Sequence, residues 1–169
     1  MRLLSILSIF LFCILPHSAA AQLRPMVYSE VSVDRSASEA FADWTTEESV
    51  ESFFAEKAFI DPVPGGDYAL WFAIDAPEGS RGSDSSTVLA VESDKMLSFT
   101  WAMPPYMPEI RPHLTVVQIL FVPVGEDRTR VRLFHTGFGS GEAWEKGHDY
   151  FEQTWPAVLS GYKEWAEAQ

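Results

Sequence analysis

The sequence predicts an α+β domain in which an antiparallel sheet packs against a long C-terminal helix. Between residues 57 and 137, apolar stretches alternate with turn residues at short intervals, and no connection is long enough for a parallel crossover. From Trp144 to Trp165, aromatic and apolar residues then recur at spacings of three and four, the pattern of one helix face. Strands therefore occupy the middle of the chain and a helix its end.

The N-terminal part of the domain predicts one strand and two short helices. Residues 27–33 alternate apolar and polar side chains, which indicates a strand. Ser36 with Glu39 has the spacing of a capping box, so a short helix should begin there. Thr45 with Glu48 repeats that spacing and predicts a second short helix that runs through Phe53 and Phe54.

Six further strands are expected, in three pairs. Residues 57–75 form a pair around the turn at 62–66, residues 86–103 a pair around 93–94, and residues 114–137 a pair around 125–128. The glycine- and serine-rich stretch 77–84 is predicted to be a turn between the first two pairs. Short connections of this kind give antiparallel neighbours.

Residues 1–21 have the features of a secretory signal peptide. Arg2 precedes an apolar run at 3–15, which is too short to span a bilayer, and small residues at 19–21 fit a cleavage site. A lipid anchor on Cys13 is disfavoured by the bulky residues before it. We therefore expect export to the periplasm or the medium, with 22–169 as one mature domain that contains no cysteine and no transmembrane segment.

The chain is strongly acidic, with a formal net charge of −12. Removal of Arg2 with the leader would leave 11 basic residues against 24 acidic ones, a net charge of −13. Such a surface repels phosphate backbones and anionic lipid, so nucleic acid is not an expected partner.

The stretch HTGFGSGEAW, residues 135–144, has the glycine content of a phosphate-binding turn between a strand and a helix. The dinucleotide fingerprint requires a third glycine where Glu142 stands, and it requires a parallel unit. The stretch is therefore interpreted as a tight turn between the last strand and the long helix.

Four stretches together resemble the domain family related to the activator of Hsp90 ATPase, within the START-like (SRPBCC) superfamily. They are DPVPGGDYAL at 61–70, DKMLSFTW at 94–101, VPVGEDRTRVRLFHTGF at 122–138 and WEKGHDYFEQTWPAVLSGY at 144–162. Where that family often has a tryptophan after the second short helix, this chain has Phe53 and Phe54. The resemblance implies the helix-grip fold, a curved sheet wrapped around the C-terminal helix.

The resemblance also implies a cavity between sheet and helix, and alternation along the strands indicates which side chains face it. His135 shares the inward face of its strand, and His148 lies on the apolar stripe of the helix. We expect the lining residues to be Phe72, Phe99, Trp101, Val117, Ile119, Leu133, His135, His148, Phe151 and Trp155. For most of these aromatic residues, simple filling of the core is the alternative interpretation.

No catalytic constellation is present, since the sequence lacks G-x-S-x-G, H-E-x-x-H and a P-loop. The histidines lack the close spacing of a metal site, and no cofactor is expected. We therefore expect a non-catalytic protein that binds a small apolar molecule or lipid, with the proline-rich segment 102–112 as a candidate lid.

Two other functions remain open from the sequence. One is a cavity enzyme, cyclase- or hydrolase-like, that uses His135 as acid or base. The alternative role for His135 is that of a buried histidine bonded within the core. The second is an interaction module like the co-chaperone relatives, which export would separate from a cytosolic Hsp90. The oligomeric state is not indicated by any pattern in the sequence.

Overall fold

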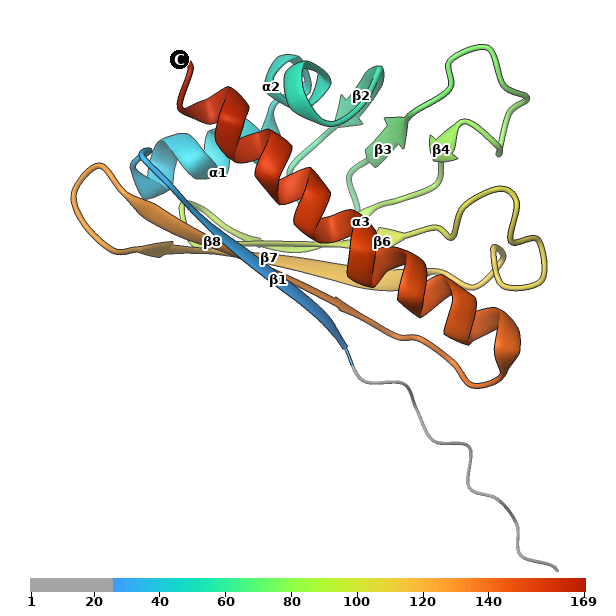
Figure 1. The fold of residues 1–169 in the computed structure, drawn as a ribbon. Coiled ribbons are helices and arrows are strands. Elements are labelled where there is room, and N and C mark those ends of the chain that lie inside the picture. Colours follow the sequence, from blue (N-terminus) through green and yellow to red (C-terminus); the bar gives the residue numbers. More distant parts are fainter. Residues whose placement is uncertain (1–25) are drawn as a thin grey trace, which may run out of the picture.

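The computed structural model describes residues 26–169, so the predicted signal peptide at 1–21 lies outside the described residues. Strand β1 is followed by two short helices, seven strands and one long helix (Figure 1). The elements are β1 Val27–Val33, α1 Ala37–Thr45, α2 Glu47–Phe53, β2 Lys57–Ile60, β3 Tyr68–Trp71, β4 Gly82–Ser83, β5 Val88–Glu92, β6 Met96–Trp101, β7 Thr115–Pro123, β8 Thr129–Thr136 and α3 Glu142–Ala166.

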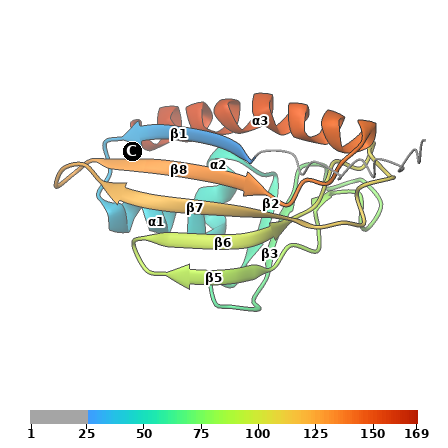
Figure 2. The same cartoon turned by 90° about the horizontal axis from the view of Figure 1, so that it is seen from below.

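The α+β helix-grip fold predicted from the sequence is confirmed, and its strands divide into two antiparallel sheets. The larger sheet has the order β1-β8-β7-β6-β5 and the smaller one the order β2-β3-β4. Figure 2 shows the five strands side by side, with α3 behind the sheet near β1. The short helices and the small sheet lie on the same face of the large sheet as α3 (Figure 1).

Within residues 26–169, the backbones of the two sheets are joined by one isolated bridge, between Asp67 and Thr87. Strand β4 was not predicted, because its two residues lie in a stretch whose glycines and serines indicate a turn. It pairs with the end of β3, where Leu70 lies opposite Ser83 and Trp71 opposite Gly82. A side chain at Gly82 would collide with the carbonyl oxygen of Leu70, so this close pairing requires glycine.

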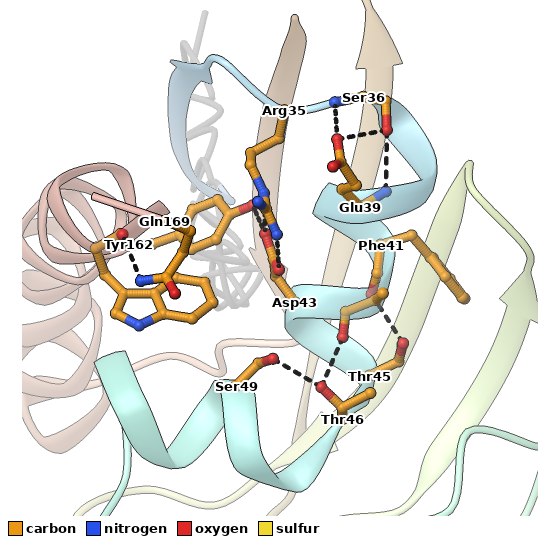
Figure 3. Close-up of polar contacts among 12 residues, drawn as sticks. Arg35, Ser36, Glu39, Phe41, Asp43, Thr45, Thr46, Ser49, Tyr162 and Gln169 are labelled. Carbon is orange, nitrogen blue, oxygen red and sulfur yellow. Dashed lines mark hydrogen bonds and ion pairs between the residues drawn. The ribbon is translucent and has the colours of Figure 1, made fainter. Parts of the chain in front are cut away.

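Capping explains how the two short helices begin. The predicted box at α1 is confirmed, because Glu39 N donates to Ser36 Oγ at 3.3 Å and Ser36 N donates to the Glu39 carboxylate at 2.8 Å. The predicted cap of α2 is wrong by one residue. Thr45 ends α1, and its hydroxyl donates to Phe41 O. Thr46 is the N-cap of α2, and its hydroxyl bonds to Ala42 O and to the Ser49 hydroxyl instead of a backbone N–H of α2 (Figure 3).

The glycine stretch before α3 is a turn, as the sequence predicts. Gly137 and Gly141 have φ angles of +91° and +100°, a region that side chains other than glycine rarely adopt. A side chain at Gly139 would collide with the indole of Trp144. Backbone conformation or close packing therefore favours glycine at each of these three positions. Gly141 is also the N-cap of α3.

A polar cluster anchors the C-terminal half of α3 to the last turn of α1 and to Arg35, which precedes α1 (Figure 3). Arg35 donates to both Asp43 carboxylate oxygens, at 2.8 and 3.2 Å, and Tyr162 donates its hydroxyl to Asp43 at 3.0 Å. Burial, followed by the nearby Asp43 carboxylate, raises the pKa of Tyr162, so its hydroxyl stays protonated and available as a donor. The cluster joins two elements that are far apart in sequence.

Candidate functional site

A pocket of about 570 Å³ lies between α3, the end of β6 and the residues that lead from β3 into β4. Its volume falls in the range of small-molecule sites. Eight of its lining residues are aromatic, namely Phe53, Phe54, Phe72, Trp101, Tyr106, Tyr150, Phe151 and Trp155. The pocket is therefore a predominantly apolar site built from elements that the fold brings together from across the chain.

The inner wall of the pocket is a set of aromatic rings in mutual contact. Trp101 and Trp155 have ring centroids 5.3 Å apart, and Phe54 lies 6.0 Å from Trp101 and 5.9 Å from Trp155. Phe151 is stacked on Trp155 at 5.7 Å, one helical turn away on α3. These distances are those of packed aromatic pairs, so the rings of the wall support one another.

The division of the sheet explains why the space is at this end of the molecule. The central face of the large sheet is filled, for example by Tyr68 stacked on Phe99 at 4.0 Å and by Phe41 packed edge-on against Phe121 at 5.5 Å. Beyond Trp101 the large sheet ends, and the small sheet departs from it after one bridge. The helix and the small sheet then face each other with no strand between them.

The proline-rich segment 102–112 forms part of the pocket boundary through Pro104, Pro105 and Tyr106. Arg111 fixes this segment to the β3–β4 connection, because its guanidinium donates to Met103 O, Gly79 O and Gly82 O. The same guanidinium lies 3.3 Å from a carboxylate oxygen of Asp84. Arg111 thus links the proline-rich segment to the β3–β4 connection, and both border the pocket. That the segment moves as a lid stays a prediction.

His135 lies behind the pocket wall in a chain of hydrogen bonds. Trp155 Nε1 donates to His135 Nδ1 at 3.0 Å. An indole N–H can only donate, so His135 Nδ1 carries the lone pair and Nε2 carries the proton. Nε2 donates to Thr115 Oγ1 at 2.7 Å, and the Thr115 hydroxyl donates to Trp101 O at 2.9 Å. Both ring nitrogens of His135 are therefore engaged within the protein.

The burial of His135 has an electrostatic consequence. The side chain is fully buried, and this burial, followed by repulsion from His148, lowers the pKa of His135 to about 3. The imidazole is neutral at physiological pH, and its lone pair is occupied by Trp155. This arrangement favours the role of a bonded core histidine over that of a general acid or base for a bound ligand.

The low pKa of His135 makes the stability of the fold dependent on pH. Between pH 6.5 and 3 the unfolded state binds a proton at this residue that the native state does not, so acidification through this window destabilises the native state. We expect the stability advantage of wild type over His135→Gln to shrink by about 2 kcal/mol between about pH 7.5 and pH 5. Urea unfolding at several pH values measures this difference, and a constant difference would contradict the low pKa.

Comparison with known protein families decides the classification of the domain. The model of the family described as Activator of Hsp90 ATPase homolog 1-like protein matches residues 34–167. The chain belongs to this family. The family lies in the START-like superfamily, whose fold supports ligand-binding and Hsp90-ATPase-activator-like domains. Among curated proteins, none matches the sequence.

Several solved structures have the same fold as this chain at low sequence identity. The Aha1 dimer from Colwellia psychrerythraea is 16% identical, with a TM-score of 0.65 over 85% of this chain and 97% of that one. A protein from Mesorhizobium loti is 19% identical, with a TM-score of 0.64 over 83% and 95%. An AHSA1-like protein from Rhizobium etli is 20% identical, with a TM-score of 0.57 over 85% and 82%. At these identities the likeness shows the fold alone.

The structure divides the ten predicted lining residues into two groups. These residues were predicted from the family resemblance and from strand alternation. Phe72, Trp101, Phe151 and Trp155 line the pocket and meet there from the residue after β3, from β6 and from α3. The remaining six are outside its lining, although all are buried. These are Phe99, Val117, Ile119, Leu133, His135 and His148.

Several lining residues of this family member were not predicted. Phe53 and Phe54 were noted only as aromatic substitutes for a tryptophan, yet both contribute to the wall. Tyr150 and Thr154 lie on α3 beside the aromatic stripe. Arg81 could have been singled out, because it is the only basic residue between Lys57 and Lys95 in the sequence.

His148 is the one predicted site residue beside carboxylates. Its Nδ1 lies 3.5 Å from Asp149 Oδ1 and 3.9 Å from Glu152 Oε2, and both ring nitrogens are buried without a hydrogen-bond partner in residues 26–169. Ligand atoms at such distances suit a divalent cation. They equally suit the ion pair that a protonated His148 would form, so the cluster does not by itself indicate a metal site.

Within the part of the chain that the structure describes, α3 is the longest helix, and neither it nor α1 or α2 has the length and apolar character needed to cross a bilayer.

Proposed function

We propose that this family member is a non-catalytic binding protein that holds a small hydrophobic molecule in the pocket between α3, β6 and the small sheet. The observation that supports this proposal is the pocket itself, with about 570 Å³ of space and a continuous aromatic wall. An apolar pocket of this size binds ligands mainly through the burial of apolar surface.

The chemistry of the lining supports binding more than catalysis. The hydroxyl of Ser83 accepts a bond from Ala102 N, and that of Thr154 donates to Tyr150 O at 2.7 Å, so both are engaged in the fold. His135, the candidate acid or base, lies behind Trp155 with both nitrogens bonded. The described lining contains no paired nucleophile and base of the kind that covalent catalysis requires.

Blocking the pocket from α3 tests the proposal. Thr154 lines the pocket, whereas Ser160 is exposed on the same helix outside the lining. We expect purified protein to bind the uncharged dye Nile red, and Thr154→Phe to weaken this binding by at least about tenfold because the added ring occupies the space. The matched control, Ser160→Phe, should bind as wild type does.

Fluorescence titration of the dye gives the affinities, and native mass spectrometry shows whether a molecule is retained through purification. Equal binding by both variants would place the dye elsewhere and contradict the proposal. No binding by the wild type to any apolar probe would contradict it as well.

We also propose that the protein acts outside the cytoplasm, after removal of residues 1–21. The support is the sequence pattern of these residues. Cell fractionation with N-terminal sequencing of the recovered protein tests this part. An intact N-terminus on a cytoplasmic protein would contradict export and would favour the Hsp90-activator-like role suggested by the family description.

A further inference from the structure

We infer that the molecule bound in this pocket is an amphiphile with an anionic head group, such as a carboxylate, and that Arg81 binds this group. The inference rests on the proposed binding function and adds the chemical class of the ligand. It depends on three features of Arg81. Arg81 is the only charged residue among the described lining residues, its guanidinium is positioned by contacts that leave donors available, and it has no acidic partner among residues 26–169.

Arg81 is the only charged side chain among the described residues that line the pocket. It is half-buried, and Phe72, Trp101 and Tyr106 belong to the same lining. A guanidinium carries a positive charge, so the otherwise apolar boundary includes one cationic side chain, whose guanidinium lies against Trp71 and Ala76 O beside the pocket. A purely apolar ligand would leave this charge without a counterion.

The guanidinium is held in position by contacts that leave most of its donors available. Arg81 Nε donates to Ala76 O at 3.1 Å, and the central carbon of the guanidinium lies 4.3 Å from the ring centroid of Trp71. The two terminal nitrogens have no acceptor within residues 26–169. They form the planar pair of donors that binds a carboxylate through two parallel hydrogen bonds.

The absence of an acidic partner is unusual in a chain with 24 acidic and 12 basic residues. Asp84 is close in sequence, but one of its oxygens accepts from the backbone N–H groups of Arg81 and Gly82 and faces the guanidinium of Arg111. Most other basic side chains of residues 26–169 have acidic partners, as Lys57 has in Glu51 and Arg132 in Glu30, and Arg130, outside the pocket lining, is the other exception. No carboxylate of residues 26–169 therefore pairs with the guanidinium of Arg81, which leaves its charge available to an anionic ligand.

Displacement of Nile red by three matched ligands tests the inference. Dodecanoate, dodecanol and dodecylammonium have the same apolar chain and differ in the charge of the head group. At neutral pH we expect wild type to bind dodecanoate at least about tenfold more tightly than dodecanol, and dodecylammonium most weakly. Arg81→Gln should lose this preference and keep the affinity for dodecanol.

Two further variants complete the experiment. Arg81→Lys keeps the charge but not the planar pair of donors, so it should retain only part of the preference. Arg130→Gln removes a charge from β8, outside the pocket lining, and should leave all three affinities unchanged.

The outcomes separate the two proposals. Equal affinity of wild type for dodecanoate and dodecanol would overturn the anionic head group and leave the binding function intact. Failure of wild type to bind any of the three ligands would overturn the binding function itself. Arg81→Gln could also lose its affinity for dodecanol while circular dichroism shows a folded protein. In that case Arg81 would shape the pocket instead of selecting the ligand, and the inference would be overturned.

Discussion

Asp43→Ala is expected to lower the free energy of unfolding by roughly 3 kcal/mol. The Asp43 carboxylate is 96% buried, and it accepts two bonds from Arg35 and one from the Tyr162 hydroxyl. Its removal leaves a partly buried guanidinium and a buried hydroxyl without their acceptor, and each then carries an uncompensated desolvation cost. Urea unfolding followed by far-ultraviolet circular dichroism measures the loss.

Two substitutions serve as controls for this prediction. Asp34→Ala removes an exposed acid whose pairing with Arg128 spans 3.7 Å, and it should change the free energy of unfolding by less than about 0.5 kcal/mol. Tyr162→Phe removes one donor from the cluster and should cost about 1 kcal/mol. If Asp43→Ala were no more harmful than Asp34→Ala, the cluster would not anchor α3 as the structure indicates.

Trp155→Ala is expected to cost about 3–5 kcal/mol of the free energy of unfolding, and to abolish tight binding of the dye. The indole is 1% exposed, and its ring packs on Trp101, Phe54 and Phe151. Its loss leaves a cavity continuous with the pocket, removes most of one wall, and deprives His135 Nδ1 of its donor. Circular dichroism is again the appropriate signal, because the substitution removes a fluorophore.

The matched variant Trp155→Phe separates the ring from its N–H group. Phenylalanine restores much of the packing but cannot donate to His135, so we expect a cost between 1 and 3 kcal/mol, roughly that of a buried acceptor left without its partner. Dye binding should be partly retained. Equal effects of the two substitutions would assign the whole contribution of Trp155 to its hydrogen bond and would contradict the packing described for the wall.

The succession of elements could be predicted from the sequence because each element has a local signal. The strand at 27–33 has strict alternation, the box at Ser36 and Glu39 begins α1, and the aromatic spacing defines α3. Strand β4 and the shift of the second cap to Thr46 depend on pairing with β3 and on the end of α1. These are tertiary effects, for which the local pattern gives no signal.

The pocket could be predicted only in part. Alternation correctly identifies side chains that face inward, but it does not tell which of them are covered by other residues and which border open space. Phe99 is inward and covered by Tyr68, whereas Trp101, two residues later on the same face, borders the pocket. The difference arises where the two sheets separate, and no pattern within either strand reports this separation.

The aromatic wall also bears on which residues of such a protein can change in sequence during evolution. Trp155 lines the pocket and is also bonded to His135, which bonds to Thr115 in the interior. A substitution at Trp155 therefore alters the pocket and the interior at once. Phe72 and Tyr106 border the same space but are 38% and 66% exposed. Under the proposed binding function, substitutions on this exposed side are expected to change ligand preference at little cost to folding. Relatives with the same fold could in this way acquire different ligands while the buried wall persists.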